Sequence, residues 1–116
     1  MFIKIRGKNV KVKFGIKFIR EIDKMSPVEQ NGIRFAMGLG AKLPELYAGN
    51  IASLSEVLYA GTVTSENRPT LDEVDYYVEN HNNIDALFDE VLKELSESAG
   101  GKKMMQTLEK ELKKVR

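Results

Sequence analysis

This chain of 116 residues lacks cysteine and long apolar runs, and each absence excludes a class of protein. It has no cysteine, which excludes a disulfide scaffold, thiol catalysis and cysteine-based zinc sites. No apolar run approaches the ~18 residues that a membrane-spanning helix needs. Met1-Phe2-Ile3 begins a predicted strand rather than a signal peptide. We therefore expect a soluble, non-exported protein with no membrane partner.

The net charge is small overall, but the charges are strongly segregated along the chain. The formal net charge is only +1, and 42% of the residues are hydrophobic, which with clear periodicity predicts one folded domain. By segment, the net charge is positive in residues 1–24 and 98–116, slightly negative in 25–65 and strongly negative in 66–97. Such a chain can pair its own basic and acidic surfaces, or offer an acidic face to a basic partner.

The first residues alternate between apolar and basic side chains, which predicts a β-hairpin. One face carries the apolar residues Ile3, Ile5, Val10, Val12 and Phe14, and the other carries Lys4, Lys11 and Lys13. A two-residue loop at Gly7-Lys8 or at Lys8-Asn9 keeps this apolar face intact, whereas a three-residue loop would flip one strand. We therefore expect a loop with an even number of residues.

Helical spacing follows the hairpin. Residues 16–25 carry an apolar stripe made of Ile16, Phe18, Ile19, Ile22 and Met25. Ser26-Pro27 should end that helix, because the residue before proline is pushed out of the α region. We expect a loop over residues 28–32 and then a poorly formed helix over residues 33–47. Two glycines and Pro44 weaken it, so the sequence predicts a kink or break between Gly40 and Pro44, and Pro44 could instead start a second short helix.

The second half of the chain has clearer helix signals. Asn50 is a good N-cap, and Thr70 with Glu73 forms a capping box. Residues 84–95 carry the most regular apolar stripe. Gly100-Gly101 predicts a hinge before a last helical segment. The predicted fold is α+β, with an N-terminal β-hairpin packed against about five helices and a mobile C-terminal helix, divided into a domain over 1–97 and a basic amphipathic segment over 98–116.

Four features could carry chemistry, and each has a simpler structural interpretation. His81 lies in a polar loop without visible partners. The carboxylates of residues 72–79 spread around a helix and do not match a calcium loop. Gly38 to Lys42 lacks the spacing of a phosphate-binding loop. The basic hairpin face lacks the interleaved aromatic residues of single-strand binders. We expect no enzyme activity, cofactor, metal or nucleic-acid partner.

The C-terminal segment is the best candidate for a partner contact. Its apolar stripe consists of Met104, Met105, Leu108 and Leu112. Methionine adapts to irregular surfaces, and a tethered amphipathic helix can dock into a groove. The alternative is that this helix packs on its own domain or stays unbound.

Two stretches, KVKFGIKFIREIDK and VEQNGIRFAMGLGAKLPELYAGN, resemble the small tail assembly chaperones of long-tailed phages and prophages of Gram-positive bacteria. The similarity continues through IASLSEVLYAGTVTSENRPTLDEVDYYVEN and IDALFDEVLKEL, and covers roughly residues 1–97. It is a resemblance of pattern and element order rather than of a catalytic signature.

The resemblance implies a non-enzymatic assembly factor in the host cytoplasm that is absent from the mature virion. Members of that family keep the tape measure protein soluble while tube subunits polymerise around it. They often occur as a short form and a longer form made by a −1 ribosomal frameshift, and this chain would be the short form. The implied partners are the tape measure protein, the tail tube protein and the long form. Weak self-association would suit such a coating protein.

Two alternatives remain open at this point. One is a structural tail component such as a completion or connector protein, which purified virions would contain. The other is a nucleic-acid-binding regulator, which would bind DNA tightly and with strong salt dependence.

Overall fold

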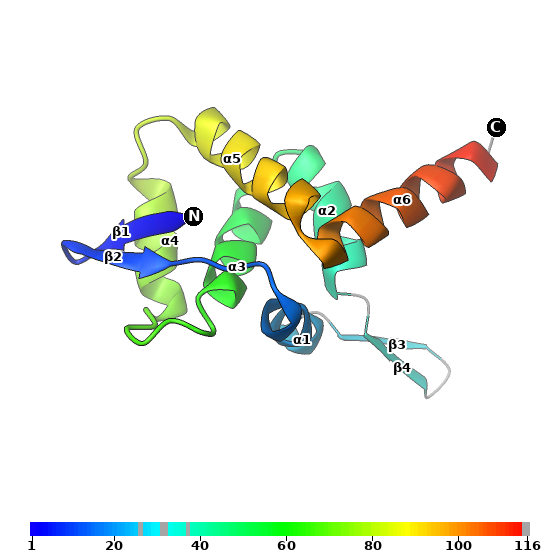
Figure 1. Ribbon diagram of the computed structural model, residues 1–116, viewed down its shortest axis with the longest axis horizontal. Coiled ribbons are helices and arrows are strands. Elements are labelled where there is room, and N and C mark those ends of the chain that lie inside the picture. The colour runs from blue at the N-terminus through cyan, green and yellow to red at the C-terminus, as the bar shows by residue number, and fades with distance from the viewer. Residues whose placement is uncertain (26, 31–32, 37, 115–116) are drawn as a thin grey trace.

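The chain begins with the predicted antiparallel hairpin (Figure 1). A computed structural model describes residues 1–25, 27–30, 33–36 and 38–114, and the side chains of residues 1–25 and 38–110. In it, β1 (Phe2–Ile5) pairs with β2 (Lys8–Lys11). The apolar face is intact as expected, because all five of its residues are buried: Ile3, Ile5, Val10, Val12 and Phe14.

The loop of this hairpin has an even number of residues, but both predicted positions were wrong. Ile5 pairs with Lys8, so the loop residues are Arg6 and Gly7. Both have positive φ, 53° and 74°, as a type I′ turn requires. Glycine is favoured at the second position of such a turn. The backbone twist therefore selects the register in which Gly7 comes second, although arginine is an unusual residue at the first position.

The described residues contain six helices, which agrees with the predicted set of about five helices and a C-terminal helix. Their bounds are α1 Ile16–Met25, α2 Gly38–Tyr47, α3 Ile51–Gly61, α4 Leu71–Glu79, α5 Ile84–Glu97 and α6 Ala99–Lys114. Figure 1 shows α3 among α1, α2, α4 and α5, with α6 leading away from them toward the C terminus. The hairpin β1–β2 contacts α4. The predicted α+β class is confirmed.

Helix α1 ends at Met25, as Ser26-Pro27 predicts. Its apolar stripe differs from the prediction at one end. Phe18 and Ile22 are buried, whereas the side chain of Ile16 is 71% exposed. With 3.6 residues per turn, Ile16 lies on the opposite side of the helix from Phe18 and Ile22. Including it in the stripe was therefore wrong.

A second hairpin occupies part of the region predicted to be a loop and a helix. β3 (Pro27–Gln30) pairs with β4 (Ile33–Ala36), and Gln30 is opposite Ile33. The loop expected at residues 28–30 and the helix expected at 33–36 were therefore wrong, while residues 31–32 lie outside the described ranges. The signal that was missed is the Asn31-Gly32 dipeptide, a strong hairpin marker when strand-like residues flank it.

Helix α2 runs through Pro44 without the predicted break, so Pro44 does not start a new helix. An interior proline costs about 3 kcal/mol, because it removes one backbone hydrogen bond and crowds the preceding turn. Leu39, Leu43 and Leu46 are all buried on this helix. Burying each leucine contributes about 1.5–3 kcal/mol, which is enough to keep the helix continuous.

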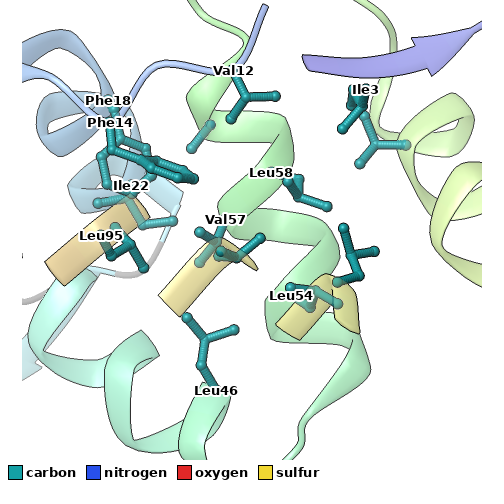
Figure 2. Packing of buried hydrophobic residues seen from close by; sticks show 14 of the residues in the cluster. Ile3, Val12, Phe14, Phe18, Ile22, Leu46, Leu54, Val57, Leu58 and Leu95 are labelled. Atoms are coloured by element: carbon teal, nitrogen blue, oxygen red, sulfur yellow. The ribbon is translucent and has the colours of Figure 1, made fainter. Parts of the chain in front are cut away.

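The core is formed around α3. Figure 2 shows Leu54, Val57 and Leu58 of α3 surrounded by side chains from the hairpin, α1, α2 and α5. Val12 and Phe14 come from the chain after β2, and the ring of Phe14 meets that of Phe18 edge to face at 4.9 Å between centroids. Residues from both ends of the described chain therefore stabilise one core.

The predicted helix starts are confirmed. The side chain of Asn50 accepts a hydrogen bond from the amide of Ser53 at 3.1 Å. The side chain of Thr70 accepts one from the amide of Glu73, and the Glu73 carboxylate accepts one from the amide of Thr70 at 3.0 Å. Helix α5 buries Leu87, Val91 and Leu95, the centre of its predicted stripe.

Candidate protein-interaction surfaces

The predicted partner-binding residues of α6 lie partly against their own domain. Met104, Met105 and Leu108 are half-buried and pack on the core, while the side chain of Leu112 lies outside the described part of the chain. A Cβ atom placed on Gly40 of α2 would be 3.5 Å from the Met104 sulfur, so α2 and α6 are in close contact there. The alternative interpretation, in which α6 packs on its own domain, is therefore supported in part. The contact with a partner stays a prediction.

The two glycines of the predicted hinge lie in the first turn of α6. A Cβ on Gly101 would be 1.8 Å from the carbonyl oxygen of Leu95, and one on Gly100 would be 2.9 Å from Ile19 Cδ1. Only glycine permits the approach to the Leu95 carbonyl at position 101, whereas the end of the Ile19 side chain could shift to admit a methyl group at position 100. The pair thus has a packing role between α5, α6 and α1. The flexibility expected at this point, and the division of the chain at residue 97, stay predictions.

An open groove of about 570 Å³ lies between the end of β1 and α4. Lys4 and Ile5 line one side, Tyr76 and Tyr77 line the other, and the loop Asn80–Asn82 completes it. The Tyr76 side chain is 68% exposed, whereas burial, together with the negative charge of Glu90, raises the pKa of Tyr77. The groove therefore offers aromatic surface, part of it already shielded from water, on a scale typical of ligand-binding sites.

The polar groups of this groove are mostly engaged with one another. Arg6 Nε lies 2.6 Å from Glu73 Oε2, which joins the hairpin turn to the first turn of α4. Hydrogen bonds from the Thr70 backbone, opposed by slight desolvation and assisted by Arg6, hold the pKa of Glu73 below its ordinary value. His81 Nδ1 accepts a hydrogen bond from the amide of Asn83 at 3.0 Å, and the His81 ring packs edge to face on Tyr77. His81 therefore stabilises its loop.

Sequence reasoning missed this groove. Neither Tyr76 nor Tyr77 was among the predicted site residues. The available signal was a pair of adjacent tyrosines on a helix, because neighbouring residues differ by about 100° and the second tyrosine can then point away from the core. The partner wall at Lys4 could not be found in this way, since it comes from a distant part of the chain.

The segment from Gly38 to Lys42 has a structural role, because Lys42 takes part in a network of ion pairs. It forms the first half of α2, and Lys42 is buried with its Nζ 2.6 Å from Glu56 Oε2 and 3.5 Å from Glu45 Oε2. Desolvation lowers the pKa of Lys42, but the attraction and hydrogen bonding of the two carboxylates outweigh it and raise the pKa. Ser53 donates a hydrogen bond to Glu45. This network joins α2 to α3.

The carboxylates of α4 also have structural roles. Asp75 accepts a hydrogen bond from Ser55 Oγ of α3. Within the described ranges, histidine and carboxylate side chains nowhere gather in threes as a metal site would need, and every helix is too short or too polar to cross a lipid bilayer.

Comparison with known proteins assigns the chain to a family. The family model of the phage tail assembly chaperone proteins matches residues 2–110, nearly the whole chain. No curated protein and no solved structure matches the chain significantly. The family model covers the first hairpin, all of the described core and the groove between β1 and α4. The chain is therefore a member of the phage tail assembly chaperone family.

Proposed function

We propose that this protein is a non-enzymatic chaperone that binds the tape measure protein and keeps it soluble in the host cytoplasm while the tail tube polymerises. Membership of the tail assembly chaperone family is the observation that carries the proposal. A tape measure protein is very long and presents much apolar surface before assembly, and large exposed apolar patches associate indiscriminately. Covering such a surface requires protein-binding faces rather than a catalytic site.

The surface of this chain supports that role. Large apolar or aromatic side chains are exposed on β1 and on each of the helices α1 to α4, namely Phe2, Ile16, Tyr47, Ile51, Leu71 and Tyr76. Dispersed contacts of this kind favour modest binding by each copy and strong binding by many copies along one long target. Tube subunits can then displace the copies one at a time.

Helix α6 is the first contact that we propose. Its Met104, Met105 and Leu108 are only half-buried, so part of each side chain is available to a partner. Methionine side chains adjust to irregular partner surfaces at low cost. The tail tube protein and a frameshifted longer product are further partners in this proposal, and the chain is the short form.

Co-expression with the tape measure protein of the same phage tests the proposal. The expected result is a higher soluble yield of the tape measure protein and a co-eluting complex that contains several copies of the chaperone. Light scattering coupled to size-exclusion chromatography would give the stoichiometry. An insoluble tape measure protein with no co-elution would contradict the proposal, and finding the chain in purified virions would favour a structural tail component.

A further inference from the structure

We propose that the groove beside β1 binds an extended segment of the tape measure protein, which pairs with the free edge of β1 as an added strand. This inference rests on the function proposed above and assigns that function a binding site and a partner chemistry. The segment would carry a large apolar side chain that packs on Tyr76 and Tyr77, and an acidic side chain that faces Lys4.

The backbone pairing identifies the free edge. Met1 and Val12 exchange two hydrogen bonds, from the Val12 amide to the Met1 carbonyl at 2.9 Å and from the Met1 amino group to the Val12 carbonyl at 3.2 Å. Hydrogen-bonded and non-hydrogen-bonded pairs alternate along an antiparallel ladder. The pairs Ile3–Val10 and Ile5–Lys8 therefore also turn their backbone groups toward each other.

It follows that the backbone N–H and C=O groups of Phe2 and Lys4 point away from β2. Among the described residues, β1 has β2 as its single strand neighbour, and neither Phe2 nor Lys4 has a backbone hydrogen bond outside that sheet. Unpaired edge groups are a template for an incoming strand. Lys4 belongs both to this edge and to the groove, so a segment paired with the edge would also lie in the groove.

The side chains around the edge indicate what the segment should contain. Tyr76 presents most of its ring to solvent, and Phe2 is 62% exposed on the same strand as Lys4. Aromatic rings in such positions bind apolar side chains with little loss of conformational freedom. The partner needs at least one large apolar residue to use this surface.

Charge complementarity indicates the second requirement. Arg6 is already paired with Glu73, whereas Lys4 has no acidic neighbour within ion-pair distance in the described part of the chain. Lys4 shares its face of the hairpin with the exposed Lys11. An acidic residue in the segment would be attracted to this face, and a basic one would be repelled.

A variant pair with matched controls tests the site. Lys4→Glu and Tyr76→Ala change the groove, while Lys17→Glu and Lys93→Ala change exposed lysines on α1 and α5. The probes are the co-expressed tape measure protein and a set of overlapping 15-residue peptides that covers its sequence. We expect the groove variants to bind the best peptide at least tenfold more weakly, and the control variants to bind within twofold of wild type.

The outcomes separate this inference from the proposed function. In one outcome, the wild-type protein co-elutes with the tape measure protein, but the groove variants bind every peptide as tightly as the control variants do. That outcome would overturn the groove as the binding site and leave the proposed function intact. A wild-type protein that neither co-elutes nor binds any peptide would overturn both. Melting temperatures within about 2 °C of wild type would show that each variant is folded.

Backbone methylation of the best peptide tests strand addition itself. Successive amides of an added strand point to opposite sides, so N-methylation at one alternate set should abolish binding and methylation at the other set should leave it nearly unchanged. Equal loss with both sets would indicate a helical or irregular ligand and would overturn the added strand.

Discussion

The backbone amide of Gly38 donates a hydrogen bond to Asp23 Oδ1 at 3.0 Å, so a carboxylate of α1 caps the N terminus of α2. The two helices touch at this point, because a Cβ on Gly38 would be 2.4 Å from the carbonyl oxygen of Ile22. This contact brings together the end of α1 and the start of α2, which lie on either side of β3 and β4 in the chain. Figure 1 shows this second hairpin extending away from the helices.

Asp23→Ala should lower the free energy of unfolding by about 1 kcal/mol, because it leaves an amide at the start of α2 without its cap. Asp23→Asn keeps an acceptor oxygen and should recover most of the loss. Urea denaturation followed by circular dichroism measures both variants. Equal midpoints for wild type and Asp23→Ala would show that the cap does not contribute.

Gly101→Ala should destabilise the protein by about 2–3 kcal/mol, because the added methyl group would overlap the carbonyl of Leu95 and force α5 and α6 apart. Gly40→Ala is the matched control within a helix. Its methyl group would meet Met104 at an ordinary contact distance, so helix propensity should make that variant as stable as wild type or up to about 1 kcal/mol more stable. Thermal unfolding of the two variants compares them directly, and similar losses for both would contradict this account.

Arg68→Ala should lower the free energy of unfolding by about 2 kcal/mol. Arg68 lies over the ring of Tyr59 at 4.1 Å, and its Nη2 is 3.2 Å from Glu21 of α1. The loop between α3 and α4 is thereby tied to α1. Arg68→Lys should not restore stability. Lysine lacks the planar guanidinium group, which can stack on Tyr59 and pair with Glu21 at the same time.

The control for Arg68 is Arg20→Ala, which removes an exposed arginine of α1. It should change the unfolding midpoint in urea by little. If Arg68→Lys unfolds at the wild-type midpoint, the stacking on Tyr59 is unimportant.

Acidification should destabilise the wild-type protein partly through Glu45. The hydrogen bond from Ser53, opposed by slight desolvation and assisted by Lys42, holds the pKa of Glu45 below its ordinary value of 4.5 in the folded state. Its contribution to stability is therefore present above that value and is lost as the pH falls through the folded pKa. Glu45→Gln should weaken the fall of the melting temperature below about pH 4.5.

Glu66→Gln serves as the control for this pH dependence, because Glu66 is exposed in the loop before α4. Its melting temperature should follow the wild-type curve over the whole acidic range. Identical curves for Glu45→Gln and wild type would show that Glu45 does not contribute to acid sensitivity.

Ending the chain after Leu108 should leave the melting temperature within about 2 °C of wild type, because the half-buried residues Met104, Met105 and Leu108 are kept. The same truncation removes Leu112 and most of the basic charge of the last helix. If the end of α6, including Leu112, contacts the tape measure protein, co-elution should weaken. Unchanged co-elution would show that residues 109–116 are not needed for the partner contact.

Much of the fold follows from local signals in the sequence. The alternation of Ile3 and Ile5 with lysines defines the buried face of the first hairpin. Asn50, Thr70 and Glu73 define helix starts, because a cap satisfies the amides of its own first turn. The stripe of α5 needs nothing beyond the 3.6-residue period. Each of these signals acts within one element, so the sequence alone determined them.

Tertiary structure decided the rest. Local propensity disfavours α2 at Pro44, yet burial of its leucines against neighbouring helices outweighs the proline. Gly101 has a packing role that no local pattern indicates, because Leu95 lies against it only in the folded structure. The groove joins Lys4 to Tyr76 across most of the chain, and no local pattern relates them. Close contacts between distant residues depend on how helices pack, and that is settled only when the whole core forms.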